Sequence, residues 1–384
     1  MCRYRETADE ECLGGKETIM AECPEILKAL DGKAVTTKEE WEGNRRGEIM
    51  DLFQDHVYGR RPCEAPAGLN FSLGYQRQNY KGHRLMYKQL WAKFPGYAFR
   101  INAFIPYSDK PVPAFVYNMH DFQMEASCIV SDLNTPYVPI LDITGRGYAV
   151  FVTYNSEIYP DLEAQGNHDC GVFGQLGPKL SDRKGNDWAS IAAWSWAMSR
   201  VMDYIETDPT IDSKRVATIG HSRGGKTALW AAAMDQRFST AFSNNSGCMG
   251  AAVLRGKQGE HIKDILVTDW FCENFTQYKD NEEALPVDQH MLIAAMAPRP
   301  VYVASSSLDS WADPEHERLG CRLASEVYEK IYGMTGVVLP NEDEVKIDTP
   351  YQEGNIGYHV KTGPHGITPV DWNYYMDFRD KKNV

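Results

Sequence analysis

The chain has 384 residues, of which 43% are hydrophobic and 24% charged, enough apolar material for one large α/β domain or two smaller ones. Its 53 acidic residues outnumber the 40 basic ones, giving a formal net charge of -13 that would repel nucleic acid and anionic membrane surfaces. No apolar run approaches the roughly 20 residues of a membrane span, so we expect neither nucleic acid nor a membrane as a partner.

The first residues do not resemble a secretory signal. Residues 1–21 include Glu6, Asp9, Glu10 and Glu11 and lack an apolar core. The sequence as written therefore predicts a cytoplasmic protein, or a secreted one if a signal peptide has been removed. The nine cysteines show no Cys-x-x-Cys spacing, which is typical of reduced thiols in a core. We expect neither a zinc site nor a disulfide framework.

Hydrophobic spacing divides the chain into two parts. Residues 1–95 are polar and rich in charge, and within them Ile49, Phe53 and Val57 recur at helical spacing. No linker rich in proline, glycine or serine follows this part. We therefore interpret it as an N-terminal segment packed on a catalytic domain at 96–384, the two forming one compact unit.

Short β-branched and aromatic runs alternate with helical periodicity in the second part. Strands are predicted at 100–106, 112–117, 147–154, 215–219, 240–243 and 299–304. Helices are predicted at 186–206, 226–234, 318–332 and 370–378. Because parallel strands are usually connected through helices, this alternation predicts an α/β protein whose mostly parallel sheet is flanked by two layers of helices.

A glycine-rich turn joins one predicted strand to the following helix. Its sequence, Gly220-His221-Ser222-Arg223-Gly224, contains Gly-x-Ser-x-Gly in the strand-turn-helix setting of a nucleophile elbow. Such a turn projects the serine hydroxyl from the carboxyl edge of the sheet. The start of the helix points its amide dipoles at the same place, where they favour a developing oxyanion. We predict Ser222 as a nucleophile.

The same stretch also fits a phosphate-binding pattern. Gly220 is followed at the required distance by Gly225, Lys226 and Thr227, as in Gly-x4-Gly-Lys-Ser/Thr. A phosphate-binding loop would be accompanied by an acidic residue on a second apolar strand, and we find no convincing one. The nucleophile elbow is the favoured interpretation.

A serine nucleophile needs a base, and the base needs an acid that fixes its tautomer; in this fold class the acid precedes the histidine in the chain. His365 lies in a loop of turn residues, whereas His359 lies in a strand-like setting that suits a structural role. Asp309 follows a predicted strand, and its rival Asp313 precedes a proline like a helix N-cap. We predict His365 as the base and Asp309 as the acid.

Eight blocks of sequence occur in an order that points to one known family. They are Gly220 to Lys226, Ser246-Gly247-Cys248, Gly259-Glu260, Trp270-Phe271, Leu285 to His290, Ala297 to Pro300, Asp309-Ser310-Trp311 and Gly363-Pro364-His365. Together they resemble the bacterial glucuronoyl esterases, over about residues 40–380. The resemblance implies an α/β-hydrolase, a three-layer sandwich, that hydrolyses esters of glucuronic or 4-O-methylglucuronic acid through an acyl-enzyme, as between xylan and lignin in plant cell walls.

The resemblance also implies roles for single residues. It makes Ser222 the nucleophile, His365 the base and Asp309 the acid. Arg223 would be a donor of the oxyanion hole, which a permanently charged guanidinium suits, although a surface ion pair is the alternative. Some members carry a glutamate after the strand that follows the nucleophile, as the acid or as its helper. Residues 243–246 contain no carboxylate here, so the acid falls on Asp309 alone.

Three further positions match residues that contact the sugar in this family: Lys226, Glu260 and Trp311. A lysine donates hydrogen bonds, a glutamate accepts them and a tryptophan offers a flat apolar surface, a combination that suits a hydroxylated ring. The expected partner is a small-molecule or oligosaccharide uronate ester. The family implies no metal and no organic cofactor.

Two other kinds of function fit the same sequence. An acetyl esterase acting on acetylated xylo-oligosaccharides, or a prolyl-oligopeptidase-like peptidase, would use the same serine, acid and histidine. An acetyl esterase would hold its sugar on the leaving-group side of the ester instead of the acyl side. A sugar-binding protein descended from a hydrolase would keep the pocket and lose catalysis.

Overall fold

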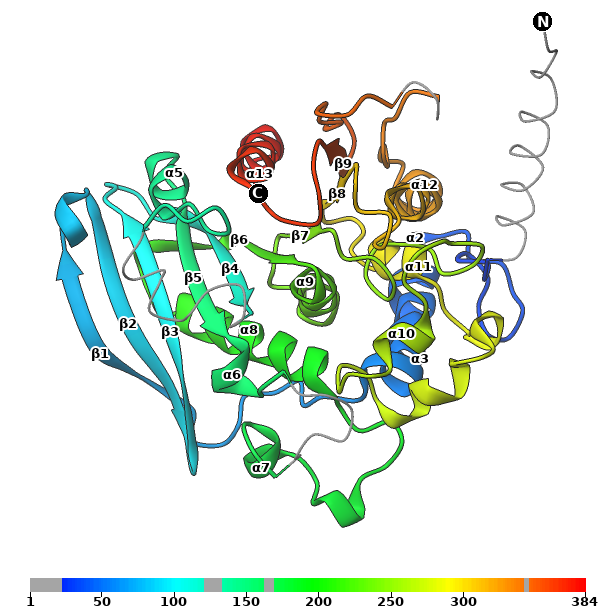
Figure 1. Ribbon diagram of the computed structural model, residues 1–384, viewed down its shortest axis with the longest axis horizontal. Helices are drawn as coiled ribbons and strands as arrows, with labels where there is room; N and C mark the ends of the chain where they lie inside the picture. The colour runs from blue at the N-terminus through cyan, green and yellow to red at the C-terminus, as the bar shows by residue number, and fades with distance from the viewer. Residues whose placement is uncertain (1–22, 121–132, 162–168, 342–344) are drawn as a thin grey trace, which may run out of the picture.

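One nine-stranded sheet forms the centre of the computed structural model, which describes residues 23–120, 133–161, 169–341 and 345–384. The strand order is β1-β2-β3-β5-β4-β6-β7-β8-β9 (Figure 1). From β5 to β9 all neighbours are parallel, and β1, β2 and β3 form an antiparallel end. The strands are β1 (Asn70–Gln78), β2 (Leu85–Phe94), β3 (Tyr97–Pro106), β4 (Val112–Met119), β5 (Ala149–Tyr154), β6 (Ile211–His221), β7 (Thr240–Asn244), β8 (Val301–Ser306) and β9 (Ile356–Lys361).

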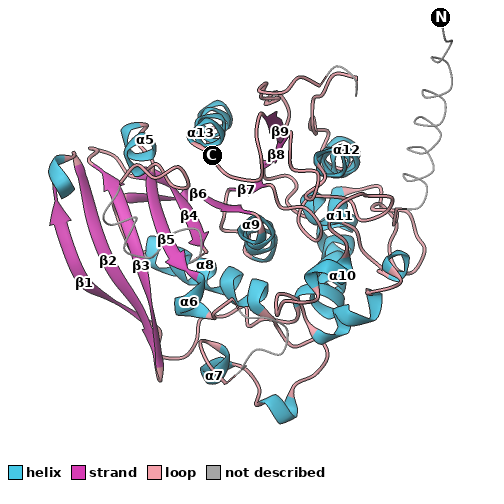
Figure 2. Cartoon of the chain, in the orientation of Figure 1, coloured by secondary structure: helices cyan, strands magenta, loops and turns pink. Residues whose placement is uncertain are grey.

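Helices cover both faces of this sheet (Figure 2). The longer helices are α3 (Arg46–Phe53), α8 (Ser190–Ile205), α9 (Arg223–Met234), α12 (Pro314–Lys330) and α13 (Pro369–Lys382). The shorter ones are α2 (Lys38–Glu40), α5 (Ile140–Gly145), α6 (Asn155–Ile158), α7 (Phe173–Leu176), α10 (Ile262–Ile265) and α11 (Gln289–Ala294). The predicted arrangement, a mostly parallel sheet between two layers of helices, is confirmed.

The two faces of the sheet carry separate apolar clusters. Along β4, Ala114 and Val116 join the cluster of α8, α9 and α12, whereas Phe115 and Tyr117 join that of α5 and α13. Successive side chains of a strand point to opposite faces, so a strand buried on both faces reads as a continuous apolar run. This is why the central strands could be predicted from composition.

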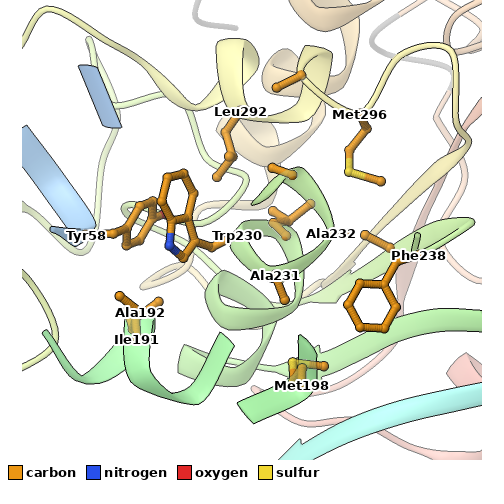
Figure 3. Packing of buried hydrophobic residues seen from close by; sticks show 14 of the residues in the cluster. Tyr58, Ile191, Ala192, Met198, Trp230, Ala231, Ala232, Phe238, Leu292 and Met296 are labelled. Carbon is orange, nitrogen blue, oxygen red and sulfur yellow. The ribbon is translucent and has the colours of Figure 1, made fainter. Parts of the chain in front are cut away.

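Helix α9 is almost completely buried beside the sheet, and its position matters because it follows the predicted nucleophile. Trp230 stacks on Tyr58 with a ring-centroid distance of 4.5 Å (Figure 3). The small side chains of Ala231 and Ala232 let neighbouring elements pack closely against the helix. Residues 224–233 of α9 are all buried. The helix is therefore fixed on every side, and so is the turn at its start.

The segment 1–95 contributes two strands to the sheet. β2 and β3 pair in antiparallel register from Leu85 with Pro106 to Phe94 with Tyr97. The predicted boundary at residue 95 therefore falls inside a hairpin of the main sheet. β1 escaped prediction although Phe71, Leu73 and Tyr75 alternate in it, because this alternation is short, lies in a polar stretch and belongs to a strand whose side chains are mostly exposed.

The strands β1, β2 and β9 were not among the predicted elements, and the elements that were predicted differ from the observed ones mainly at their ends. α9 begins at Arg223, three residues before the predicted start, and α12 begins at Pro314 instead of 318. In both places a residue with positive φ, Ser222 or Asp313, turns the chain directly into the helix. In the described part of the chain, no helix is long and apolar enough to cross a membrane. Residues 1–21, on which the cytoplasmic prediction depends, lie outside the described residues.

Candidate active site

Ser222 occupies a strained turn between β6 and α9. Its φ of 57° and ψ of -125° lie in a region that non-glycine residues rarely adopt, at a typical cost of about 1–3 kcal/mol. The surrounding hydrogen bonds hold it there: Ser222 N–H donates to the Asn244 carbonyl at 2.8 Å, and Gly225 N–H donates to the Ser222 carbonyl at 2.8 Å. The side chain remains partly exposed. This is the geometry that the Gly-x-Ser-x-Gly motif predicts.

The motif glycines are required by close packing. A Cβ on Gly220 would lie 2.0 Å from the carbonyl oxygen of Gly224, a distance no side chain tolerates. A Cβ on Gly224 would lie 3.2 Å from Nε2 of His120 and 3.3 Å from the carbonyl oxygen of Asn118. The turn can close against its neighbours only because these positions lack side chains.

Asp309 and His365 meet at the carboxyl edge of the sheet. Asp309 follows β8 and His365 follows β9, and these strands are parallel neighbours. Oδ2 of Asp309 lies 2.6 Å from Nδ1 of His365 and accepts a hydrogen bond from the Asn245 amide at 2.8 Å. Burial alone would raise the pKa of Asp309, but the contacts with His365 and Asn245 bring that pKa below its ordinary value.

His221 places this pair beside the serine. Its ring lies 4.5 Å from the ring of His365, centroid to centroid, and it directly precedes Ser222 in the chain. Nδ1 of His221 is 2.7 Å from Oδ1 of Asn244, and burial lowers the pKa of His221 to about 3. His221 is therefore a neutral neighbour. The fold gathers Ser222, His365 and Asp309 at one edge, while their roles in catalysis stay predictions.

The two rival residues make contacts of another kind. His359 is fully buried in β9, with Nε2 2.9 Å from Oδ1 of Asp371 and Nδ1 3.0 Å from the Tyr302 hydroxyl. Asp313 caps α12, where its carboxylate accepts the His316 N–H at 3.2 Å. Both contacts suit the structural parts that the sequence suggested for these residues.

Arg223 lies between an acid and an aromatic ring. Its guanidinium forms an ion pair with Asp161 and sits 4.5 Å from the ring centroid of Trp270. The Trp270 indole N–H also donates to Asp161, at 2.8 Å. The side chain of Arg223 is thus held in place by an ion pair, the alternative that its sequence left open. Its predicted part in the oxyanion hole remains a prediction.

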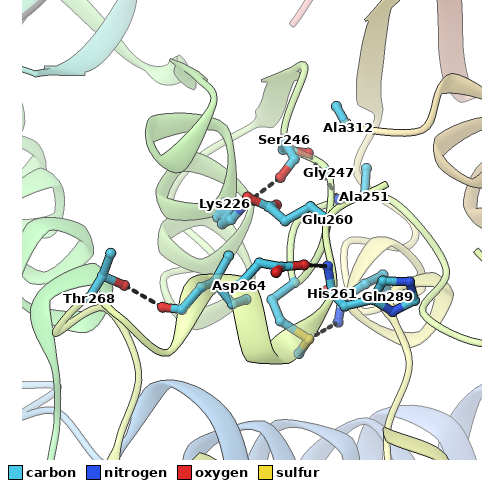
Figure 4. A network of polar contacts seen from close by, with 12 residues as sticks. Lys226, Ser246, Gly247, Ala251, Glu260, His261, Asp264, Thr268, Gln289 and Ala312 are labelled. Carbon is cyan, nitrogen blue, oxygen red and sulfur yellow. Dashed lines mark hydrogen bonds and ion pairs between the residues drawn. The ribbon is translucent and has the colours of Figure 1, made fainter. Parts of the chain in front are cut away.

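Lys226 and Glu260 form a nearly buried ion pair one helical turn beyond Ser222. Nζ of Lys226 lies 3.2 Å from Oε2 of Glu260 and donates to the Ser246 carbonyl at 2.7 Å (Figure 4). Lys226 also lies 5.7 Å from the ring centroid of Trp270. The backbone N–H of Glu260 donates to the Trp311 carbonyl at 2.9 Å. The three residues predicted to contact a sugar are therefore neighbours.

Trp311 presents its side chain to solvent. The residue is 54% exposed, an unusual state for a large aromatic side chain that is mostly buried in proteins. It lines a pocket of about 620 Å³ together with Gln258, Ser310 and Ile347. An exposed indole beside a pocket is a surface on which a sugar ring can stack.

Sequence reasoning missed several residues of this site. Trp270 stands in one of the blocks that carry the family resemblance but has no predicted role, and nothing in the sequence indicates the contacts that Asp161 and Asn245 make. Their signal was weak because each acts through a residue that is distant in the chain. Among the described residues, no group of three or more His, Cys, Asp or Glu side chains is arranged to hold a metal ion.

Comparisons with known proteins identify the family. The family description "Glucuronyl esterase, fungi" matches residues 143–332. The carbohydrate esterase MZ0003, from an unknown prokaryotic organism, is 34% identical over 93% of this chain and 88% of its own length. The chain belongs to the glucuronoyl esterase family. The predicted family and its class of reaction, carboxylic ester hydrolysis, are confirmed.

Two further relatives of this glucuronoyl esterase family member extend the comparison. A solved structure of a glucuronoyl esterase from Solibacter usitatus superposes with a TM-score of 0.83 at 30% identity, covering 93% of this chain and 97% of that one. The 4-O-methyl-glucuronoyl methylesterase of Schizophyllum commune is 26% identical over 80% of this chain and 73% of its own length. The match at 143–332 contains Ser222 and Asp309 and stops before His365.

Proposed function

We propose that the protein is a serine esterase that hydrolyses esters of glucuronic or 4-O-methylglucuronic acid. The observation that carries the proposal is the placement of the Lys226–Glu260 pair one helical turn from Ser222, with the Glu260 backbone bonded to that of Trp311, whose side chain is exposed. Because these polar groups lie beside the predicted nucleophile, they favour a substrate whose sugar is in the acyl part of the ester.

Ser222 carries out the covalent step. Its hydroxyl attacks the ester carbonyl while Nε2 of His365 takes the proton, and Asp309 holds the opposite ring nitrogen of His365. The tetrahedral oxyanion is stabilised by the amide end of α9. His365 then gives its proton to the departing alcohol, and the uronate acyl group remains on Ser222. A water molecule, deprotonated by His365, releases the uronic acid and restores the serine.

The sugar contacts follow from the chemistry of the pocket. Lys226 can donate to a ring hydroxyl or to the ring oxygen, and Glu260 can accept from a hydroxyl. Because each already has its partner, the pair is held in one orientation before substrate arrives. Trp311 supplies an exposed flat face on which the sugar can stack. The pocket that Trp311 lines is bordered by neither Ser222 nor the Lys226–Glu260 pair, so it would receive only a part of a small-molecule or oligosaccharide ester that extends beyond them.

Rates on two substrates test the proposal. We expect hydrolysis of methyl glucuronate with loss of activity in Ser222→Ala, and little release of acetate from acetylated xylobiose. Acetate release without cleavage of methyl glucuronate would make the protein an acetyl esterase. A protein that binds glucuronate and hydrolyses neither substrate would be a binding protein.

A further inference from the structure

A chain of buried polar side chains ends on Asp309. Nζ of Lys361, at the end of β9, donates to Oγ of Ser306 at the end of β8. Oγ of Ser306 lies 3.2 Å from Oδ1 of Asn245, and the Asn245 amide nitrogen lies 2.8 Å from Oδ2 of Asp309. All four residues are almost completely buried, with Lys361 only 3% exposed. The chain joins β8, β9 and the loop after β7.

Lysine at the far end fixes the direction of every bond in the chain. An ammonium group can only donate, so Ser306 accepts from it and turns its own O–H toward the carbonyl oxygen of Asn245. The amide group of Asn245 is then left facing Asp309 with a donor. A carboxylate meets this donor best when it is ionised. Through these three successive hydrogen bonds, Lys361 therefore favours the charged form of Asp309.

The backbone of Asn245 fixes the orientation of its side chain within this chain of hydrogen bonds. Asn245 adopts a positive φ of 46°, which asparagine tolerates better than most residues, and its N–H donates to the Ala304 carbonyl at 2.7 Å. The side chain is thus anchored between β7 and β8 and can bond only in this direction. The position after β7 holds Asn245 instead of an acid. Its side-chain amide donates a hydrogen bond to Asp309, the carboxylate that follows β8.

We propose that Lys361 is a positioning residue of the triad, which acts through Ser306 and Asn245 to hold the Asp309 carboxylate ionised and aimed at His365. The proposal rests on the parts given to Asp309 and His365 in the proposed function. It adds a residue that touches neither substrate nor the reacting atoms.

The charges around Lys361 are mostly negative. Asp309, Asp371 at the start of α13, Asp348 and Glu317 on α12 all favour the charged ammonium, whereas burial lowers the pKa of Lys361. On the other side, His365 faces Asp309 and the neutral ring of His221. The ammonium group is therefore the positive charge that offsets these carboxylates. Without it, the uncompensated negative charge would favour the protonated imidazole of His365.

Lys361→Met tests the proposal, with the titration of the His365 ring followed by NMR and assigned with His365→Gln. We expect the ring to titrate at a pH higher by about half a unit to one unit, as for the loss of a nearby partly screened charge. In the same variant, kcat on methyl glucuronate should fall about tenfold at pH 7, with KM little changed. Lys88→Met is the matched control, because Lys88 is a partly buried lysine paired with Asp208 at the antiparallel end of the sheet. It should cost stability and leave the His365 titration where it was.

Ser306→Ala keeps the cation and interrupts the chain, so it decides the matter if Lys361→Met does not fold. We expect kcat to fall threefold to tenfold with KM unchanged. A His365 titration in folded Lys361→Met that matches the unmodified protein would overturn the proposal, as would full activity in Ser306→Ala. The NMR titration needs no substrate, so a protein that fails to cleave glucuronate esters would refute the proposed function and still report on Lys361.

Discussion

The carboxylate of Asp309 lies 2.6 Å from Nδ1 of His365, although 56 positions separate the two residues in the chain. They meet because each follows one of two parallel neighbouring strands, whose carboxyl ends share an edge of the sheet. The predicted acid after β8 thereby reaches the predicted base without a carboxylate after β7. Asn245 in that position donates a hydrogen bond to the same oxygen.

Ser222→Ala should abolish ester hydrolysis, with a loss of at least about 10⁴-fold in kcat, because no other group replaces the nucleophile. The matched variant Ser222→Gly should be equally inactive and more stable than Ser222→Ala by about 1 kcal/mol, since glycine adopts a φ of 57° without strain. Steady-state kinetics and urea unfolding measure the two effects. Equal stability of the two variants would show that the turn is not strained.

Lys226→Met should raise KM about tenfold on methyl glucuronate and also lower stability. The sequence places Lys226 among the residues predicted to contact the sugar, so its loss should weaken binding. The structure adds a folding cost, because Lys226 is 3% exposed and its loss leaves Glu260 unpaired. Adding Glu260→Gln should recover part of the stability and none of the affinity. A double variant with restored KM would mean that the pair serves folding alone.

Trp311→Ala should weaken substrate binding and leave the free energy of unfolding within about 0.5 kcal/mol, because the side chain is largely exposed. Leu308→Ala is the matched control, since Leu308 is 72% exposed in the same loop. KM for methyl glucuronate should rise several-fold in the first variant and stay constant in the second. Equal KM values in both variants would remove Trp311 from the binding surface.

Glu317→Gln should change how stability depends on pH. Burial raises the pKa of Glu317 from its ordinary 4.5 to about 7, although Ser305 and the N–H groups of Ser246 and Gly247 bond to it. An acid with a raised folded-state pKa opposes folding increasingly as pH rises from 4.5 to 7, by up to about 1.4 kcal/mol per pH unit. Glutamine keeps an acceptor for the two N–H groups and has no charge.

The stability of Glu317→Gln relative to the unmodified protein should therefore increase between pH 5 and pH 8. Urea unfolding at both pH values measures this difference, and Glu329→Gln, an exposed position on the same helix, is the control. A difference that does not vary with pH would mean that Glu317 is ionised throughout this range.

The sequence predicted the parts of the site whose chemistry is local. Gly220, Ser222 and Gly224 carry their turn within five residues, between the strand β6 and the helix α9. Chain order and turn residues narrowed the base and the acid to His365 and Asp309, which the fold brings together across 56 positions, while their catalytic roles stay predictions. For the turn, the pattern and the structure it specifies occupy the same short stretch.

Other parts could not be predicted because their meaning depends on distant partners. Lys361 reads as an ordinary strand residue, and only the fold shows it buried against Ser306. Trp270 reads as core, and only the fold places it under Arg223 and Lys226. The edge strand β1 has no fully buried residue, and its alternation of Phe71, Leu73 and Tyr75 is too short to indicate a strand by itself. The type of a residue limits the interactions that its side chain can make, and the tertiary fold determines which of them form.

Identification of the acyl group carried by Ser222 tests the account most directly. The protein is mixed with methyl glucuronate or with acetylated xylobiose, quenched in acid within the first turnovers and digested for mass spectrometry. The account predicts a glucuronoyl ester on the peptide that contains Ser222, and none in Ser222→Ala. An acetyl ester on that peptide with no glucuronoyl ester, or a glucuronoyl group on a different residue, would contradict it.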